Sequence, residues 1–215
     1  MINTIIYGFN QVVSADKEAT LFLNYNMGTY ADSIFWCLSS KLIWIPIAIF
    51  FLYLIAVKKN YSLAMKIFIV IGLAITITLC DQISSSFFKP LVARYRPSHD
   101  IEINAMLHYV NNYHGGRYGF MSSHAANAFG AALLGSKIIR KKYFTIFIFS
   151  LATLVAYSRI YLGVHFLGDV VCGAIVGITV AYGIYYLLKL LRAWLRNKAI
   201  QHAWFRIPEE VKMAA

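Results

Sequence analysis

The sequence predicts an all-α protein, a polytopic membrane helical bundle of about five to six transmembrane helices with an N-terminal interfacial helix. The 215 residues are 60% hydrophobic and have a mean hydropathy of +0.61, which is too apolar for an ordinary soluble domain. Apolar runs of spanning length recur along the chain. The basic residues concentrate between alternate runs, as in membrane proteins that have one orientation.

The N-terminal region has the pattern of helices that lie on a membrane rather than cross it. Residues 2–13 place apolar side chains at helical spacing with polar ones opposite. Asp16 is expected to be the N-cap of a second short helix that runs through Leu23. We therefore expect residues 1–30 to form N-terminal interfacial helices outside the bundle.

A transmembrane bundle is predicted over residues 34–192. Its first span centres on residues 42–57, with a kink at Pro46. The other four expected spans are residues 67–88, 120–136, 143–157 and 170–188. Residues 1–196 thus form a single membrane-embedded domain, and residues 197–215 form a basic tail.

The distribution of basic residues predicts the orientation. Thirteen of the 20 Lys and Arg residues lie in segments 58–66 and 137–142 and in the C-terminal residues 189–212. The positive-inside rule places these segments and the C-terminus in the cytoplasm. The net charge of +11 then reflects topology and anionic lipid heads, and not nucleic acid. The short chain and the absence of eukaryotic sorting signals favour a bacterial inner membrane, with the opposite face toward the periplasm.

Unusual polar clusters fall at the outer ends of the spans. Lys89, Arg94 and Arg96 close the second span. They form either an interfacial collar or a grip for the non-bridging oxygens of a phosphate. Outer collars usually contain few basic residues, which favours the grip.

A second cluster opens the third span with Ser122, Ser123 and His124. Backbone N–H groups at a helix start, together with serine hydroxyls, bind anions, and His124 could donate a proton to a leaving group. The alternative is a serine N-cap followed by a histidine that is hydrogen-bonded inside the bundle.

The third cluster contains Arg159, His165 and Asp169. If a helix begins after Gly163, the imidazole and the carboxylate four residues later point from one face, and the carboxylate orients the base or nucleophile. The alternative is a helix end whose polar residues cap the backbone and reach toward the interface.

The clusters together favour a ligand. An ionised side chain costs roughly 2.5–3.5 kcal/mol at the bilayer centre, so grouped charges need partners. Cations outnumber nearby carboxylates in these blocks. The simplest missing anion is a phosphate.

The pattern Lys-x6-Arg-Pro, then Ser-x-His, then Ser-Arg-x5-His-x3-Asp resembles the three-part signature of the type 2 phosphatidic acid phosphatase family. The resemblance covers residues 81–170. It implies an integral membrane enzyme that removes phosphate from lipid phosphates or pyrophosphates without a metal or other cofactor. The chain departs from the usual Pro-Ser-Gly-His block, because Met121 and Ser123 replace the proline and the glycine.

The resemblance also implies roles for individual residues. His165 is the expected nucleophile, which forms a phosphohistidine, and Asp169 orients it. His124 is expected to protonate the leaving oxygen and then to activate water. The expected phosphate-binding residues are Lys89, Arg96, Arg159, Ser122 and Ser123.

Further residues are expected to assist. Arg117 and Arg94 are candidate extra phosphate contacts, and Asp81 is a candidate partner inside the bundle. The segment 98–119 is expected to form a gate or a head-group contact, and its histidines lack zinc spacing.

We therefore predict a phosphatase for an amphiphilic phosphate in the outer leaflet. Undecaprenyl pyrophosphate, phosphatidate or phosphatidylglycerol phosphate, and lipid A phosphate all fit. A phosphotransferase that passes the phosphoryl group to another lipid would use the same site. A non-enzymatic anion or lipid transporter is the alternative from another class. The expected partners are the lipid substrate and the bilayer, and the sequence carries no signal for an oligomeric state.

Overall fold

A computed structural model describes residues 2–205, although the side chains of residues 2–6, 9, 41 and 199–205 lie outside this description. Over that range the chain is helical and contains no strand beyond an isolated bridge between Tyr95 and Tyr118. The α-helices are α1 (Ile2–Leu23), α2 (Thr29–Ser39), α3 (Trp44–Ala56), α4 (Leu63–Gln82), α5 (Lys89–Val92), α6 (Ser123–Ile139), α7 (Lys142–Tyr161) and α8 (Leu167–Phe205). The predicted all-α membrane bundle is confirmed.

Helix α6 forms the centre of the bundle and packs against α8, α7 and α4. Small residues allow the close approach of α6 to α8. A Cβ atom at Gly177 would lie 2.1 Å from the carbonyl oxygen of Ala126, and one at Gly173 would lie 2.4 Å from that of Ser122. Glycine therefore brings the start of α8 directly against the start of α6.

Among the described residues, three segments are long and apolar enough to cross a membrane: Leu63–Val92, Lys142–Tyr161 and Leu167–Lys198. A fourth crossing is formed if the bent pair Thr29–Ser39 and Trp44–Ala56 counts as one span. Helix α6 has 17 residues, at the short end of the range for a crossing. The predicted number of five to six transmembrane helices therefore stays a prediction.

The first span does not bend where the sequence suggested. The break lies at Ser40 and the 3₁₀ turn η1 (Lys41–Ile43), and the two helices are bent by 55°. Pro46 is the third residue of α3. A proline in the first turn removes no intrahelical hydrogen bond, because the first N–H groups of a helix have no partner within it.

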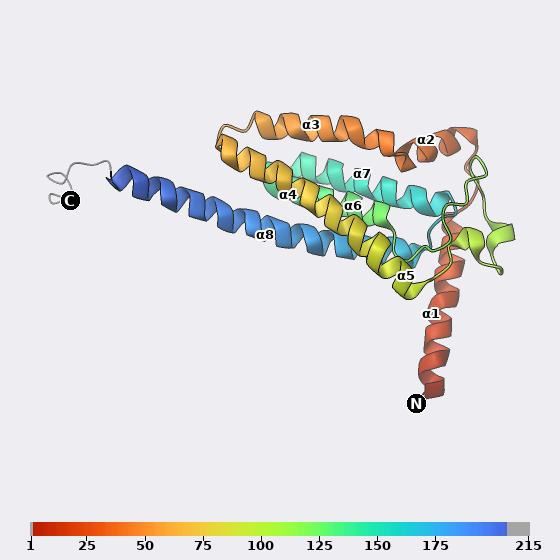
Figure 1. Ribbon diagram of the computed structural model, residues 1–215. Helices are drawn as coiled ribbons and strands as arrows, with labels where there is room; N and C mark the ends of the chain where they lie inside the picture. The colour runs from red at the N-terminus through yellow and green to blue at the C-terminus, as the bar shows by residue number, and fades with distance from the viewer. Residues whose placement is uncertain (1, 206–215) are drawn as a thin grey trace.

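The N-terminal region is also different from the prediction. The two expected short helices are one continuous helix, α1, so Asp16 is not an N-cap. Its carboxylate instead accepts a hydrogen bond from the backbone N–H of Gly168, at 2.8 Å. Helix α1 crosses the end of the bundle at a steep angle to the other helices (Figure 1).

The two ends of the bundle differ (Figure 1). The α3–α4 connection, the α6–α7 turn and the distal part of α8 lie toward one end, and α1, α2, α5 and the 93–119 segment lie at the other. The basic segments 58–66 and 137–142 therefore lie away from the polar blocks. Helix α8 continues through Phe205, past the predicted tail boundary at 197. Residues 206–215 of the predicted tail lie outside the described residues.

Candidate active site

The three polar blocks come together at the end of the bundle that carries α1. The positively charged neighbours of His165 are Arg96, Arg159 and Lys89. Two of these cations, Arg159 and Lys89, also lie near His124, as does His165 itself. One residue cluster thus combines side chains from α5, α6, α7 and two connecting segments.

His165 and Asp169 form the buried centre of this cluster. Nδ1 of the imidazole lies 3.4 Å from Oδ2 of the carboxylate, and the exposed fractions of the two side chains are 1% and 0%. His165 lies in the turn before α8 and not on the helix, because α8 begins at Leu167. The pairing expected from the spacing of four therefore forms, although only Asp169 is helical. With Nδ1 held by the carboxylate, Nε2 is the nitrogen that can meet a substrate.

The surroundings of His165 keep its imidazole neutral. Burial, and then the positive charges of Arg96, Arg159 and Lys89, lower the pKa of His165 well below its usual value. A neutral imidazole retains the lone pair that a nucleophile needs.

Arg96 joins the first block to the third. Its Nε donates to the carbonyl oxygen of Tyr118 at 3.1 Å, and its NH1 donates to that of Val164 at 3.2 Å. The side chain is buried, with 8% of its surface exposed. These bonds hold the guanidinium beside His165 before any substrate binds.

Lys89 reaches the cluster through a local distortion of the second span. The chain forms a π-helical turn, η2 (Ile83–Phe88), between α4 and α5. A π-turn changes the direction in which later side chains point, and Lys89 directly follows this turn. Asp81 lies among the charged neighbours of Lys89, and its Oδ1 accepts a hydrogen bond from Ser85 at 3.4 Å.

Arg159 is the most deeply buried of these cations, with 3% of its surface exposed. Its NH1 donates to the hydroxyl of Ser39, at the end of α2. Its Nε is buried and has no hydrogen-bond partner among the described residues. An unpaired buried guanidinium N–H is costly, so this donor suits an anionic ligand. No sequence pattern indicated the contact with Ser39, which is distant in the chain.

The second block contributes both an N-cap and a histidine. Ser122 is buried and caps α6, where its hydroxyl accepts from the N–H of Ala125 at 3.4 Å. Its own N–H donates to the carbonyl oxygen of Asp169 at 3.0 Å. Ser122 thus connects α6 to α8. Ser123 and His124 line a cavity next to the cluster.

The two accessory arginines have partners within the protein. Arg94 pairs with Asp16 at 2.7 Å and with Asp169 at 3.2 Å. Arg117 is exposed and donates to the hydroxyl of Tyr95 at 2.8 Å. The structure therefore gives each of these guanidinium groups a contact other than the phosphate contact expected from sequence.

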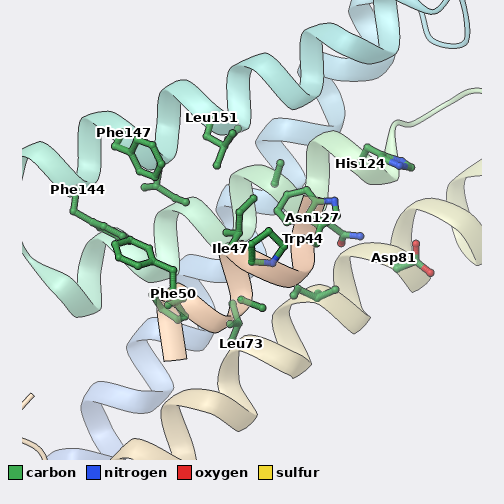
Figure 2. Close-up of a pocket in the computed structure, with 18 of the residues that line it drawn as sticks. Trp44, Ile47, Phe50, Leu73, Asp81, His124, Asn127, Phe144, Phe147 and Leu151 are labelled. Carbon is green, nitrogen blue, oxygen red and sulfur yellow. The ribbon is translucent and has the colours of Figure 1, made fainter. Parts of the chain in front are cut away.

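An apolar cavity of about 540 Å³ adjoins the site. Aromatic and aliphatic side chains of α3, α4, α6 and α7 line it, and Asp81, His124 and Asn127 lie at its polar end (Figure 2). The Oδ1 of Asn127 is buried and has no hydrogen-bond partner in the described part of the chain. The cavity can hold an apolar chain whose polar end approaches His124.

The segment 98–119 is anchored rather than loose. Leu107 and Val110 are buried, and the side chain of Asn24 bonds both to the N–H of His108 (2.7 Å) and to its carbonyl oxygen (3.2 Å). Lys17 forms ion pairs with Asp100 at 2.9 Å and with Glu102 at 2.8 Å. These contacts hold the segment in place beside the site, and its role as a gate or a head-group contact stays a prediction.

An all-α membrane bundle that gathers buried cations and a histidine–carboxylate pair at one end defines a membrane-embedded enzyme for an anionic substrate. The model of the PAP2 superfamily matches residues 64–193, which contain all three blocks. The chain belongs to the PAP2 superfamily, as the sequence signature predicted.

Two relatives are similar over most of their length. The chain is 39% identical over 192 residues to the lipid A 4'-phosphatase of Porphyromonas gingivalis, covering 89% of this chain and 80% of the relative. It is 37% identical over 183 residues to the lipid A 4'-phosphatase of Bacteroides thetaiotaomicron, covering 85% of this chain and 80% of the relative. The protein is thus an integral membrane phosphatase that acts on a lipid phosphate.

Two solved structures share the fold. One is a transmembrane PAP2-type phosphatidylglycerolphosphate phosphatase from Bacillus subtilis, with a TM-score of 0.62 at 19% identity, covering 86% of this chain and 87% of that one. The other is LpxE from Aquifex aeolicus, with a TM-score of 0.57 at 22% identity, covering 78% of this chain and 92% of that one.

Proposed function

We propose that this protein hydrolyses the 4'-phosphate ester of lipid A through a phosphohistidine at His165, without a metal ion. The two relatives that are lipid A 4'-phosphatases support the substrate. The observation that carries the mechanism is the buried His165–Asp169 pair among Lys89, Arg96 and Arg159.

In the first step, Nε2 of His165 attacks the phosphorus in line with the leaving sugar oxygen. The P–N bond forms as the P–O bond breaks, and His124 transfers its proton to the leaving oxygen. Asp169 stabilises the positive charge that develops on the imidazole. The position of His124 at the polar end of the cavity supports this role. If the lipid chain occupies the cavity, the leaving oxygen at its polar end lies beside His124.

In the second step, water attacks the phosphohistidine from the side that the leaving group has vacated. His124, now neutral, accepts a proton from the water, the P–N bond breaks, and inorganic phosphate leaves. His165 is then neutral again, so both histidines return to their starting states.

Metal independence is supported by the charges of the site. Three cations, Lys89, Arg96 and Arg159, lie around His165 and stabilise the equatorial oxygens of the transferring group as metal ions do elsewhere. Divalent metals prefer oxygen, imidazole or thiolate ligands, and a cluster of cations repels them.

The cavity supports an amphiphilic substrate. The volume of about 540 Å³ and the apolar lining fit an acyl chain. The polar end of the cavity, at Asp81 and Asn127, suits the hydroxyl or amide groups of a sugar. We propose that an acyl chain attached close to the phosphate occupies this cavity.

We also propose that the site faces the periplasm of a bacterial inner membrane and that the C-terminus is cytoplasmic. The basic segments at the opposite end of the bundle support this orientation. Helix α1, which crosses the end of the bundle, would then lie along the outer surface of the membrane (Figure 1).

The test is phosphate release by the purified protein in detergent, from lipid A, phosphatidylglycerol phosphate and undecaprenyl pyrophosphate, with and without EDTA. We expect the fastest release from lipid A, no effect of EDTA, and no activity in His165→Ala. Rapid quenching followed by intact mass spectrometry should detect a phosphorylated wild-type protein and none in His165→Ala.

Three results would contradict the proposal. Loss of activity in EDTA that added metal restores would refute metal independence. A preference for another lipid phosphate would refute the substrate. Phosphate release only when an acceptor lipid is present, or transfer to that lipid without release, would favour a phosphotransferase.

A further inference from the structure

Helix α1 lies outside the matched family region of residues 64–193, yet it contacts the start of α8 at two points. Oδ1 of Asp16 accepts from the N–H of Gly168 at 2.8 Å, across 152 residues of sequence. The hydroxyl of Thr20 accepts from the N–H of Leu167 at 3.0 Å, across 147 residues. Two of the first N–H groups of α8 are therefore capped by a different helix.

Asp16 also reaches the catalytic carboxylate through an arginine. Its Oδ2 pairs with NH2 of Arg94 at 2.7 Å, and NH1 of the same guanidinium bonds to Oδ1 of Asp169 at 3.2 Å. The guanidinium packs on the ring of Phe166, 3.9 Å from its centroid. Arg94 is thus held on two edges and on one face.

In this arrangement the two carboxylate oxygens of Asp169 have different partners. Oδ1 faces Arg94, whereas Oδ2 accepts from the N–H of Phe166 at 3.1 Å and lies 3.4 Å from Nδ1 of His165. An arginine bound only to Asp169 could form a two-pronged pair with both oxygens and draw Oδ2 away from the imidazole. Asp16 holds one edge of the guanidinium and prevents this.

We infer that Asp16 is a positioning residue, which acts through Arg94 to hold Asp169 against His165. The inference rests on the proposed function, in which Asp169 orients the nucleophile. Asp16 lies on the N-terminal helix. The link consists of the charged residues Asp16, Arg94 and Asp169, and of these three Asp16 is the one that lies outside the signature blocks. The active centre therefore extends beyond the three sequence blocks.

The matched substitutions are Asp16→Asn and Thr20→Val. Asparagine keeps the shape and the acceptor for the Gly168 N–H but loses the charge that faces Arg94. Valine at position 20 keeps the shape but loses the neighbouring cap on Leu167, away from Arg94. We expect Asp16→Asn to lower kcat by roughly tenfold with little change in KM, and Thr20→Val to lower the melting temperature while kcat is unchanged.

A second comparison tests the route of the effect. If Asp16 acts through Arg94, Asp16→Asn should lower kcat much less in an Arg94→Met protein than in the wild type. Glu18→Gln, on the exposed side of α1, should leave kcat unchanged in either background. Nitrogen-15 spectra of histidine-labelled protein in micelles give a further readout without substrate, because they report the tautomer of His165. We expect Asp16→Asn to reduce the Nδ1–H form.

The inference is overturned if Asp16→Asn retains the wild-type kcat and the wild-type His165 spectrum. It is also overturned if the loss is as large in the Arg94→Met background, or if Thr20→Val reproduces it. A wild-type protein that releases no phosphate from any lipid would refute the proposed function instead. The spectra of Asp16→Asn would then still decide the link to His165.

Discussion

A Cβ atom placed on Gly119 would lie 2.8 Å from Oδ2 of Asp169, the oxygen that faces His165. The same atom would lie 3.2 Å from Cγ of Arg96. The backbone at Gly119, just before α6, therefore packs directly against the histidine–carboxylate pair, and any side chain larger than that of glycine would displace Asp169.

We predict that Gly119→Ala lowers kcat by roughly tenfold to a hundredfold, because displacement of a catalytic group by a fraction of an ångström disturbs its alignment. The measurement is steady-state phosphate release from lipid A. Gly116→Ala is the matched control, because a Cβ atom there has no heavy atom within 4 Å. Equal activity of both variants would show that Asp169 tolerates the displacement.

The contact of α6 with α8 gives a prediction about stability. A Cβ atom at Gly177 would lie 2.1 Å from the carbonyl oxygen of Ala126, so Gly177→Ala must push the helices apart. We expect a loss of about 1–3 kcal/mol in the free energy of unfolding. Gly183→Ala in the same helix meets nothing within 4 Å and should be neutral, or stabilising by up to about 1 kcal/mol. Thermal unfolding in detergent compares the two, and a Gly177→Ala protein as stable as wild type would contradict the packing.

The low pKa of His165 predicts the pH dependence. Protonation of His165 removes the nucleophile, so kcat/KM should fall on the acid side only well below the usual histidine pKa of 6.5. Arg96→Gln removes a nearby positive charge, makes protonation easier and raises this pKa. The acid limb should therefore move to higher pH, apart from the loss of phosphate binding.

The measurement for this prediction is kcat/KM against pH for wild type, Arg96→Gln and Arg140→Gln with one substrate, so that ionisation of the substrate is common to all three. Arg140 lies at the other end of the bundle, at the C-terminus of α6, and should leave the acid limb in place. A limb that stays in place or moves to lower pH in Arg96→Gln would contradict the assignment.

The cavity predicts a selective effect on lipid substrates. Ala131 lines it, and Ala131→Phe would fill part of its volume. We expect KM for lipid A to rise by roughly tenfold, while the activity toward p-nitrophenyl phosphate, which has no acyl chain, is largely retained. Val171→Phe adds bulk on the exposed side of α8 and should change neither value. Equal losses for both substrates in Ala131→Phe would indicate general misfolding and not an acyl-chain site.

The sequence by itself determined the class of protein, since apolar run length and helical periodicity are local properties. It also identified the three blocks, because their spacings lie within single segments. Ser122 caps the N–H of Ala125, three residues later, and His165 pairs with Asp169, four residues later. Contacts this close in sequence can be predicted from a local pattern.

The tertiary structure alone decided how distant segments meet. Asp16, Arg94 and Ser39 find partners 75 to 152 residues away, and no local pattern specifies such contacts. Asp16 looked like a cap for its own helix and instead caps α8. Arg94, a candidate accessory phosphate contact from the sequence, also pairs with two carboxylates. The partner of a polar side chain depends on which helices pack together. That packing rests on contacts between distant segments, such as Gly177 with Ala126, which form only in the folded chain.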